Sequence, residues 1–204
     1  MSDNSETDNN GSDNSPRRLA AIAGFTGDEE TSRELLNHDD PSVRATALKA
    51  LSRMGAIDVD LVRKALEDPA PTVRRRGLEL AIPFDSIDLA PLLVDPDNSV
   101  VEQCAWAAGE RAKADAQVIE ALCEIALHHE DSLCREAAVA ALGAIGDPVA
   151  LPTILSATKD KATVRRRAVI ALAPFEGPEV DIALQLAAKD RDWQVRQAAE
   201  DLLT

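Results

Sequence analysis

The stretch Asp131–Asp147, with the sequence DSLCREAAVAALGAIGD, is the part of the chain that indicates the fold most directly. Small or apolar residues recur there at fixed intervals, at Cys134, Ala138, Ala141, Leu142 and Ile145. This spacing places them on one face of a helix with about 3.6 residues per turn. Asp131 stands where a side chain caps the helix N-terminus by accepting backbone N–H groups. Gly143 and Gly146 fall where we expect the helix to close and the chain to turn.

The same pattern recurs along the chain, and we call the position of Cys134 the anchor of its repeat. The six anchors are Val43, Val73, Val100, Cys134, Val164 and Val195. Successive anchors are separated by 30, 27, 34, 30 and 31 residues. Four anchors have an aspartate three residues before them, at Asp40, Asp97, Asp131 and Asp192. A period near 30 is typical of repeats that are made of two stacked helices.

Each anchor helix, which we call the second helix of its repeat, is expected to follow a first helix. The expected first helices are residues 28–37, 58–67, 86–94, 115–129, 148–158 and 178–189. The third contains Pro91, which lacks a backbone donor, so we expect irregular geometry there. The predicted fold class is all-α, an α-solenoid of about six helical hairpins.

Residues 1–16, MSDNSETDNNGSDNSP, contain nothing to bury apart from Met1. Such a segment cannot offset the entropy of ordering, so we predict a disordered acidic tail at 1–16 and the solenoid at 17–204. Arg17 and Arg18 precede a short apolar run that ends at Phe25 and resembles a twin-arginine export signal. No cleavage site follows a full-length apolar region, and we therefore expect a cytoplasmic protein.

The repeat of Asp131–Asp147 resembles the HEAT-like repeats of the phycobilisome lyase family, and the resemblance extends over roughly residues 28–204. It implies the α-solenoid fold. It says little about activity, because the matching residues are mostly structural.

The formal net charge is −14 and the pI is near 4.6. This charge argues against duplex nucleic acid and anionic membranes as partners. Arginine outnumbers lysine 16 to 6, and aspartate outnumbers glutamate 21 to 15. An acidic surface that is poor in lysine resembles cytosolic proteins of halophilic archaea, and an acidic protein of an ordinary cytosol is the alternative.

An arginine follows the anchor in five repeats, at Arg44, Arg74, Arg135, Arg165 and Arg196. We expect these arginines and the capping aspartates to form a ladder of charge-assisted hydrogen bonds between neighbouring repeats, in preference to an anion-binding row. The third repeat has Val101 at this position, so the ladder is expected to be broken there.

The candidate partner-binding residues lie off the core stripe of the second helices. Arg75, Arg76, Arg166 and Arg167 follow two of the ladder arginines and could bind carboxylate or phosphate, with a solvated helix face as the alternative. Six residues after three consecutive anchors stand Trp106, Ala140 and Ile170, an apolar row of the kind that anchors interfaces. Trp106 alone could instead fill a gap between repeats.

The residues that could carry catalysis are few. Cys104, Cys123 and Cys134 form no C-x-x-C pair, which argues against a zinc site and a disulfide framework. The family of deoxyhypusine hydroxylase holds two irons with several His-Glu pairs, whereas this chain has one, at His129-Glu130. We expect no catalytic residue, metal or cofactor.

The function that these observations favour is a non-enzymatic scaffold or adaptor that binds another protein, possible roles being signalling or taxis. The alternative is a subunit related to bilin lyases or to another HEAT-repeat enzyme. A DNA glycosylase of this fold uses a basic channel, which an acidic chain does not favour. The sequence leaves the oligomeric state and the identity of the partner open.

Overall fold

The computed structural model describes residues 15–111 and 113–203, and every regular element within them is an α-helix or a 3-10 helix. The predicted tail lies outside the described residues except for Ser15 and Pro16, which cap and begin the first helix. The chain divides into two compact units, Met1–Leu80 (unit 1) and Ala81–Thr204 (unit 2).

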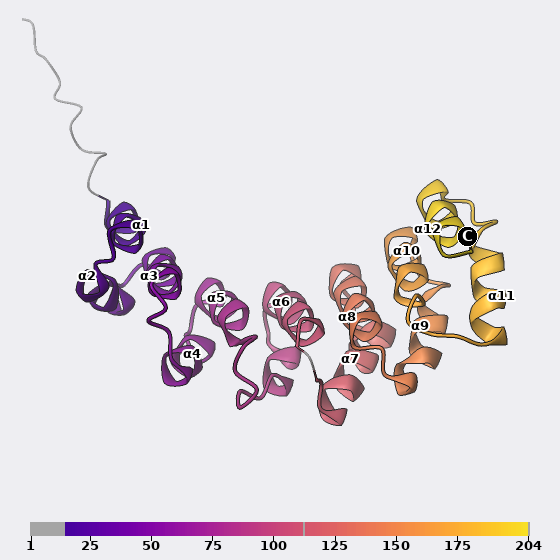
Figure 1. Ribbon diagram of the computed structural model, residues 1–204, viewed down its shortest axis with the longest axis horizontal. Helices are drawn as coiled ribbons and strands as arrows, with labels where there is room; N and C mark the ends of the chain where they lie inside the picture. Colours follow the sequence, from indigo (N-terminus) through magenta and orange to yellow (C-terminus); the bar gives the residue numbers. More distant parts are fainter. Residues whose placement is uncertain (1–14, 112, 204) are drawn as a thin grey trace, which may run out of the picture. The chain divides into compact units, whose positions relative to one another are not determined.

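Unit 1 begins with α1 (Pro16–Thr26) and continues with two helical hairpins (Figure 1). The first hairpin consists of α2 (Glu29–Glu34), η1 (Leu35–Asn37) and α3 (Pro41–Arg53). The second consists of α4 (Val59–Leu66) and α5 (Pro71–Ala81), whose last residue is the first of unit 2. The second helices α3 and α5 follow α1 in one row, and α2 and α4 lie in the other.

Unit 2 contains four further repeats with the same order of elements. Its first-helix segments are η2 (Ala90–Val94), α7 (Ala116–His128), η3 (Pro148–Ala150) with α9 (Leu151–Ala157), and α11 (Pro178–Ala187). Its second helices are α6 (Asn98–Gly109), α8 (Ser132–Ile145), α10 (Ala162–Ala171) and α12 (Trp193–Leu203). Each of these second helices contacts the next one in the row (Figure 1).

The anchors and caps that the sequence predicted are confirmed. All six anchors are at most 2% exposed. Asp40, Asp97, Asp131 and Asp192 each accept a hydrogen bond from the backbone N–H two residues later, at 2.8–2.9 Å. Burial raises the pKa of the Cys104 thiol to about 12, as expected for a cysteine that packs as a small apolar residue.

The third repeat is irregular, as Pro91 predicted, because its first helix is reduced to the 3-10 segment η2. The turns that precede η2 are held by Arg111, which follows α6. Its guanidinium donates to the carbonyl oxygens of Ile87, Ala81 and Phe84 at 2.8, 3.1 and 3.3 Å. A side chain thereby satisfies backbone groups that a regular helix would have paired internally.

Helix α1 is an addition to the predicted elements. It packs on α3 as α6 packs on α8, so it is a second helix without a first helix among the described residues. Its Gly24 lies against Ala50, where an added Cβ would stand 2.8 Å from the Ala50 Cβ. The same fit recurs at Gly109 with Ala141 and at Gly143 with Ala171.

Gly143 therefore has a different role from the predicted one. It lies inside α8, and a Cβ there would stand 2.6 Å from the Cα of Ala171, closer than two helices can tolerate. Gly146 does end the helix as expected, in the left-handed conformation with φ of 68°.

Candidate binding surfaces on the second helices

The arginine that follows the anchor joins neighbouring repeats, as expected, but its acidic partner is not the capping aspartate. Arg135 donates to Asp160 through Nε and Nη2 at 2.7 and 2.8 Å, and Arg165 donates to Asp190 in the same way at 2.9 and 2.7 Å. Arg44 makes the equivalent pair with Asp68. The partner stands four or five residues before the next anchor, whereas the predicted one stands three before an anchor.

Each ladder arginine also closes the turn before its own helix. The Nη1 group of Arg135 donates to the carbonyl oxygens of His129 and Glu130 at 2.7 and 3.1 Å. The corresponding Nη1 bonds are made by Arg44, Arg74, Arg165 and Arg196. The hydrogen bonds from Arg135 and Arg165 hold the pKa values of the Asp160 and Asp190 carboxyls below their ordinary range.

The ladder is interrupted at Val101, as predicted, and its acidic position is changed with it. Val101 is buried and cannot donate, and the position that Asp160 and Asp190 occupy elsewhere is held by His129. The Nδ1 atom of His129 accepts the Asp131 N–H at 3.1 Å, as the Asp190 carboxylate accepts the Asp192 N–H at 2.8 Å. The histidine thus provides the acceptor for this turn at a repeat that lacks a ladder arginine.

The predicted partner-binding arginines differ in their surroundings. In unit 1, Arg75 is exposed, and Arg76 is paired with Glu79 of the same helix. In unit 2, Arg167 of α10 lies 3.4 Å from Glu136 of α8, and Arg166 is partly buried beside it in the sequence. The Nε atoms of Arg76, Arg166 and Arg167 are buried without a hydrogen-bond partner among the described residues. The two arginine triplets belong to separate units.

The structure places the predicted apolar row on three adjacent helices of unit 2. Trp106 of α6 is 44% exposed and Ile170 of α10 is 43% exposed, with the partly buried Ala140 on α8 between them in the order of helices. Trp106 therefore keeps a large part of its indole surface in solvent. Glu102 and Glu110, four residues to either side of it on the same helix face, are both exposed.

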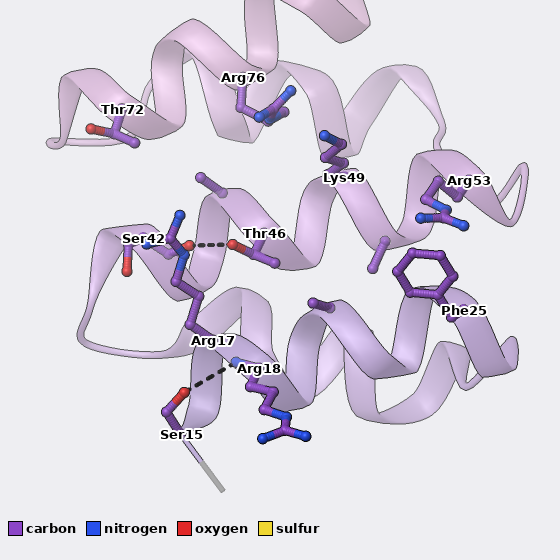
Figure 2. A pocket seen from close by; sticks show the side chains of 14 residues that line it. Ser15, Arg17, Arg18, Phe25, Ser42, Thr46, Lys49, Arg53, Thr72 and Arg76 are labelled. Atoms are coloured by element: carbon purple, nitrogen blue, oxygen red, sulfur yellow. Dashed lines mark hydrogen bonds between the residues drawn. The ribbon is translucent and has the colours of Figure 1, made fainter. Parts of the chain in front are cut away.

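A groove of about 620 Å³ is lined by α1, α3 and α5 of unit 1 (Figure 2). Five cationic side chains line it, from Arg17, Arg18, Lys49, Arg53 and Arg76. No carboxylate belongs to the set of described residues that lines the groove. The hydroxyl-bearing residues Ser15, Ser42, Thr46 and Thr72 complete its polar lining.

One contact orients a cation of the groove, and two hydrogen bonds involve Ser42 in its α3 wall. The Arg53 guanidinium lies over the Phe25 ring, 3.6 Å from its centre, which orients the side chain by a cation–π interaction. The Thr46 hydroxyl donates to the Ser42 carbonyl oxygen at 2.7 Å (Figure 2). Asp40, the nearest capping carboxylate on α3, is engaged with the Ser42 N–H at 2.8 Å, and that hydrogen bond lowers the pKa of its carboxyl.

A family model for HEAT repeats matches residues 9–82, 88–173 and 119–204. The chain belongs to the HEAT repeat family. The comparison with curated proteins gave no match. The phycobilisome lyase branch that the sequence resembles is a finer assignment than this match provides.

Solved structures similar to this HEAT repeat chain include human deoxyhypusine hydroxylase in complex with glycerol, with 22% identity over 94% of this chain and 80% of that chain, and a TM-score of 0.49. An engineered protein has 21% identity over 92% of this chain and 87% of its own, with a TM-score of 0.47. A designed armadillo repeat protein has 16% identity over 92% and 89%, with a TM-score of 0.45. None of these similarities bears on the activity of this chain.

Of the five groove cations in this HEAT repeat protein, only Arg76 was a sequence-predicted site residue. Arg17 and Arg18 were interpreted through their resemblance to an export signal, and α1 was not expected as a helix. Lys49 and Arg53 follow the first anchor by six and ten residues. Arg76 follows its anchor by three residues, so the groove cations share no repeated position that the sequence alone could reveal.

Within residues 15–111 and 113–203, no group of three or more His, Cys, Asp or Glu side chains is placed to hold a metal ion. In the same part of the chain no helix is both long and apolar enough to cross a bilayer.

Proposed function

We propose that this HEAT repeat chain is a non-enzymatic scaffold that binds another protein through the second helices α6, α8 and α10. The observation that carries the proposal is the row formed by Trp106, Ala140 and Ile170 at one helical position of three adjacent helices. Trp106 is 44% exposed as a residue, so it keeps apolar surface in water at a free-energy cost that a partner would remove.

The surroundings of the row indicate the kind of partner. Glu102 and Glu110 flank Trp106, and the Glu136 carboxylate on α8 is engaged by Arg167. An amphipathic segment with apolar side chains facing the row and a basic residue near Trp106 complements this surface. Aromatic anchors of this type contribute a large share of the binding energy at protein interfaces.

The resemblance of Asp131–Asp147 supports placing the scaffold in the phycobilisome-lyase-like branch of HEAT repeats. Its acidic, arginine-rich composition supports a high-salt cytosol of a halophilic archaeon as its setting, with signalling or taxis as the process it serves. At about 1 M salt the Debye length is roughly 3 Å, so a partner must be held by apolar contact and short hydrogen bonds.

The test is affinity capture at about 1 M salt, where exposed charges are screened. It uses three forms of the full chain: wild type, Trp106→Ala with Ile170→Ser, and the control Ile182→Ser. Ile182 is 57% exposed on α11, which is the first helix of its repeat. Its replacement therefore removes exposed apolar surface from a helix outside the proposed interface. A protein captured by wild type and control is then purified and titrated. We expect the double variant to bind it at least about 30-fold more weakly. Equal affinity for all three forms would contradict the proposal.

A further inference from the structure

We propose that the groove lined by α1, α3 and α5 binds a carboxylate-rich peptide segment of a partner protein, independently of the row on unit 2. The argument begins with charge. Acidic residues outnumber basic ones 36 to 22 in the chain, yet the described residues that line this groove comprise five cations and no acid. Local charge opposite to that of the whole protein is a feature of surfaces that select an oppositely charged ligand.

Arg76 of the groove is paired with Glu79, but three other groove cations are available in a way that the ladder arginines are not. Arg44, like the other ladder arginines that bridge two repeats, donates its N–H groups to an aspartate and to backbone carbonyl oxygens. Arg17, Lys49 and Arg53 are exposed and have no acidic ion-pair partner among the described residues. The Arg53 guanidinium lies 3.6 Å from the centre of the Phe25 ring. A guanidinium held against an aromatic ring can still donate two N–H groups to a carboxylate.

The size of the groove favours an extended segment over a small anion. Packed helices lie about 8–10 Å apart, so a path across α1, α3 and α5 is roughly 20 Å long. An extended peptide covers that distance in about six residues at about 3.3 Å per residue. Cations on all three helices can then be met by successive side chains, whereas one small anion would reach only a few of them.

The chemistry of the lining favours a peptide over a nucleic acid. Ser42 and Thr72 add hydroxyl groups that can hydrogen-bond to a peptide backbone, and the 73% exposed Phe25 offers an apolar contact at one side of the groove. A nucleic acid carries a charge along its whole length and would meet the net charge of −14 beyond the groove. A short acidic segment presents its charge only where the cations are.

The experiment is a fluorescence anisotropy titration of labelled hexaglutamate with the full chain. The groove variant carries Arg17→Ser and Lys49→Ser. The matched control carries Arg63→Ser and Lys64→Ser, which remove the same charge from exposed positions on α4, outside the groove. At about 0.1 M salt we expect the groove variant to lose at least tenfold in affinity, and the control to stay within about twofold of wild type.

The proposal would be overturned by equal losses in groove and control variants, which would mean nonspecific charge attraction. It would also be overturned by tighter binding of single-stranded DNA than of hexaglutamate through the same residues. Residues 1–14 contain Asp3, Glu6, Asp8 and Asp13 and directly precede Ser15, so their carboxylates can compete with the probe. The titration is therefore repeated with these four residues changed to amides. Absence of probe binding to both chains would also overturn the proposal. Since Trp106 and Ile170 are intact throughout, each of these failures leaves the proposed function standing.

Discussion

The turns between repeats and the groove on unit 1 both depend on cationic side chains, and they use them in opposite ways. At the turns, Arg135 and Arg165 are each held by two bonds to an aspartate and by backbone carbonyls. In the groove, Arg17 and Lys49 have no ion-pair partner among the described residues. We infer from this difference that an arginine of this chain is available to a ligand only where no acidic side chain of the chain pairs with it.

Acidification gives the largest expected effect, through the paired aspartates at the turns. The pKa values of Asp160 and Asp190 are lowered by their arginine partners, so the pairs stabilise the fold above the ordinary aspartate pKa of about 3.9. This stability is lost as the pH falls through the lowered pKa of the folded state. Urea unfolding between about pH 6 and pH 2.5 should therefore show a decline that begins below about pH 4.

The contribution of the turns to that decline is isolated by a variant with Arg135→Met and Arg165→Met. Without the guanidinium groups, Asp160 and Asp190 should titrate closer to the unfolded chain, and the free energy of unfolding should depend less on pH. The same pH dependence in wild type and variant would show that other carboxylates cause the decline.

Removal of a single ladder arginine gives the second largest effect. Arg165 is 6% exposed. Arg165→Met removes the donor of the Asp160 carbonyl and leaves the Asp190 carboxylate with the Asp192 N–H but without its guanidinium partner. We expect a loss of about 3 kcal/mol in the free energy of unfolding, measured with urea. The neighbouring Arg166→Met should cost less than about 1 kcal/mol. Similar losses of unfolding free energy in Arg165→Met and Arg166→Met would contradict the view that the ladder arginine is structural and its neighbour is not.

The turn before Cys134, where the arginine ladder is interrupted at Val101, allows a finer test. His129→Ala removes the acceptor of the Asp131 N–H and should cost about 1 kcal/mol. His129→Asp restores an acceptor of the type found at Asp190. We expect this variant to recover at least about half of the stability lost in His129→Ala, measured by thermal unfolding. If both variants melt alike, the histidine has a role at this turn other than accepting the hydrogen bond.

The groove should show the smallest effect on stability. The Arg17→Ser and Lys49→Ser variant removes two exposed cations that make no ion pair within the described part of the chain. Its free energy of unfolding should stay within about 0.5 kcal/mol of wild type. Urea unfolding measures this directly, and a loss of several kcal/mol would place these residues among the structural ones.

The fold could be predicted because a repeated sequence reports the same local geometry several times. The anchors, the caps and the irregular segment at Pro91 follow from helix periodicity and proline chemistry, which need no tertiary information. The acidic partners of the ladder arginines did not follow, because they stand 24 or 25 residues away and their reach depends on the turn conformation. Helix α1 was missed because it lacks both the capping aspartate and the ladder arginine.

Of the two candidate sites, one could be predicted from the sequence and the other could not. The row of Trp106, Ala140 and Ile170 repeats one helical position, so its residues could be named from the sequence, and its role as an interface stays a prediction. The groove combines residues between Ser15 and Arg76 from three helices at different positions of the repeat. Its defining property, the exclusion of carboxylates from a surface of an acidic chain, exists only in three dimensions.

The most direct test of this account measures peptide affinity and unfolding free energy on the same two variants of the full chain. For Arg17→Ser with Lys49→Ser, we predict at least tenfold weaker hexaglutamate binding at unchanged stability. For Arg165→Met, we predict a loss of about 3 kcal/mol in stability while the folded protein binds hexaglutamate as wild type does. The opposite assignment, with stability lost in the groove variant and affinity lost in Arg165→Met, would contradict the account.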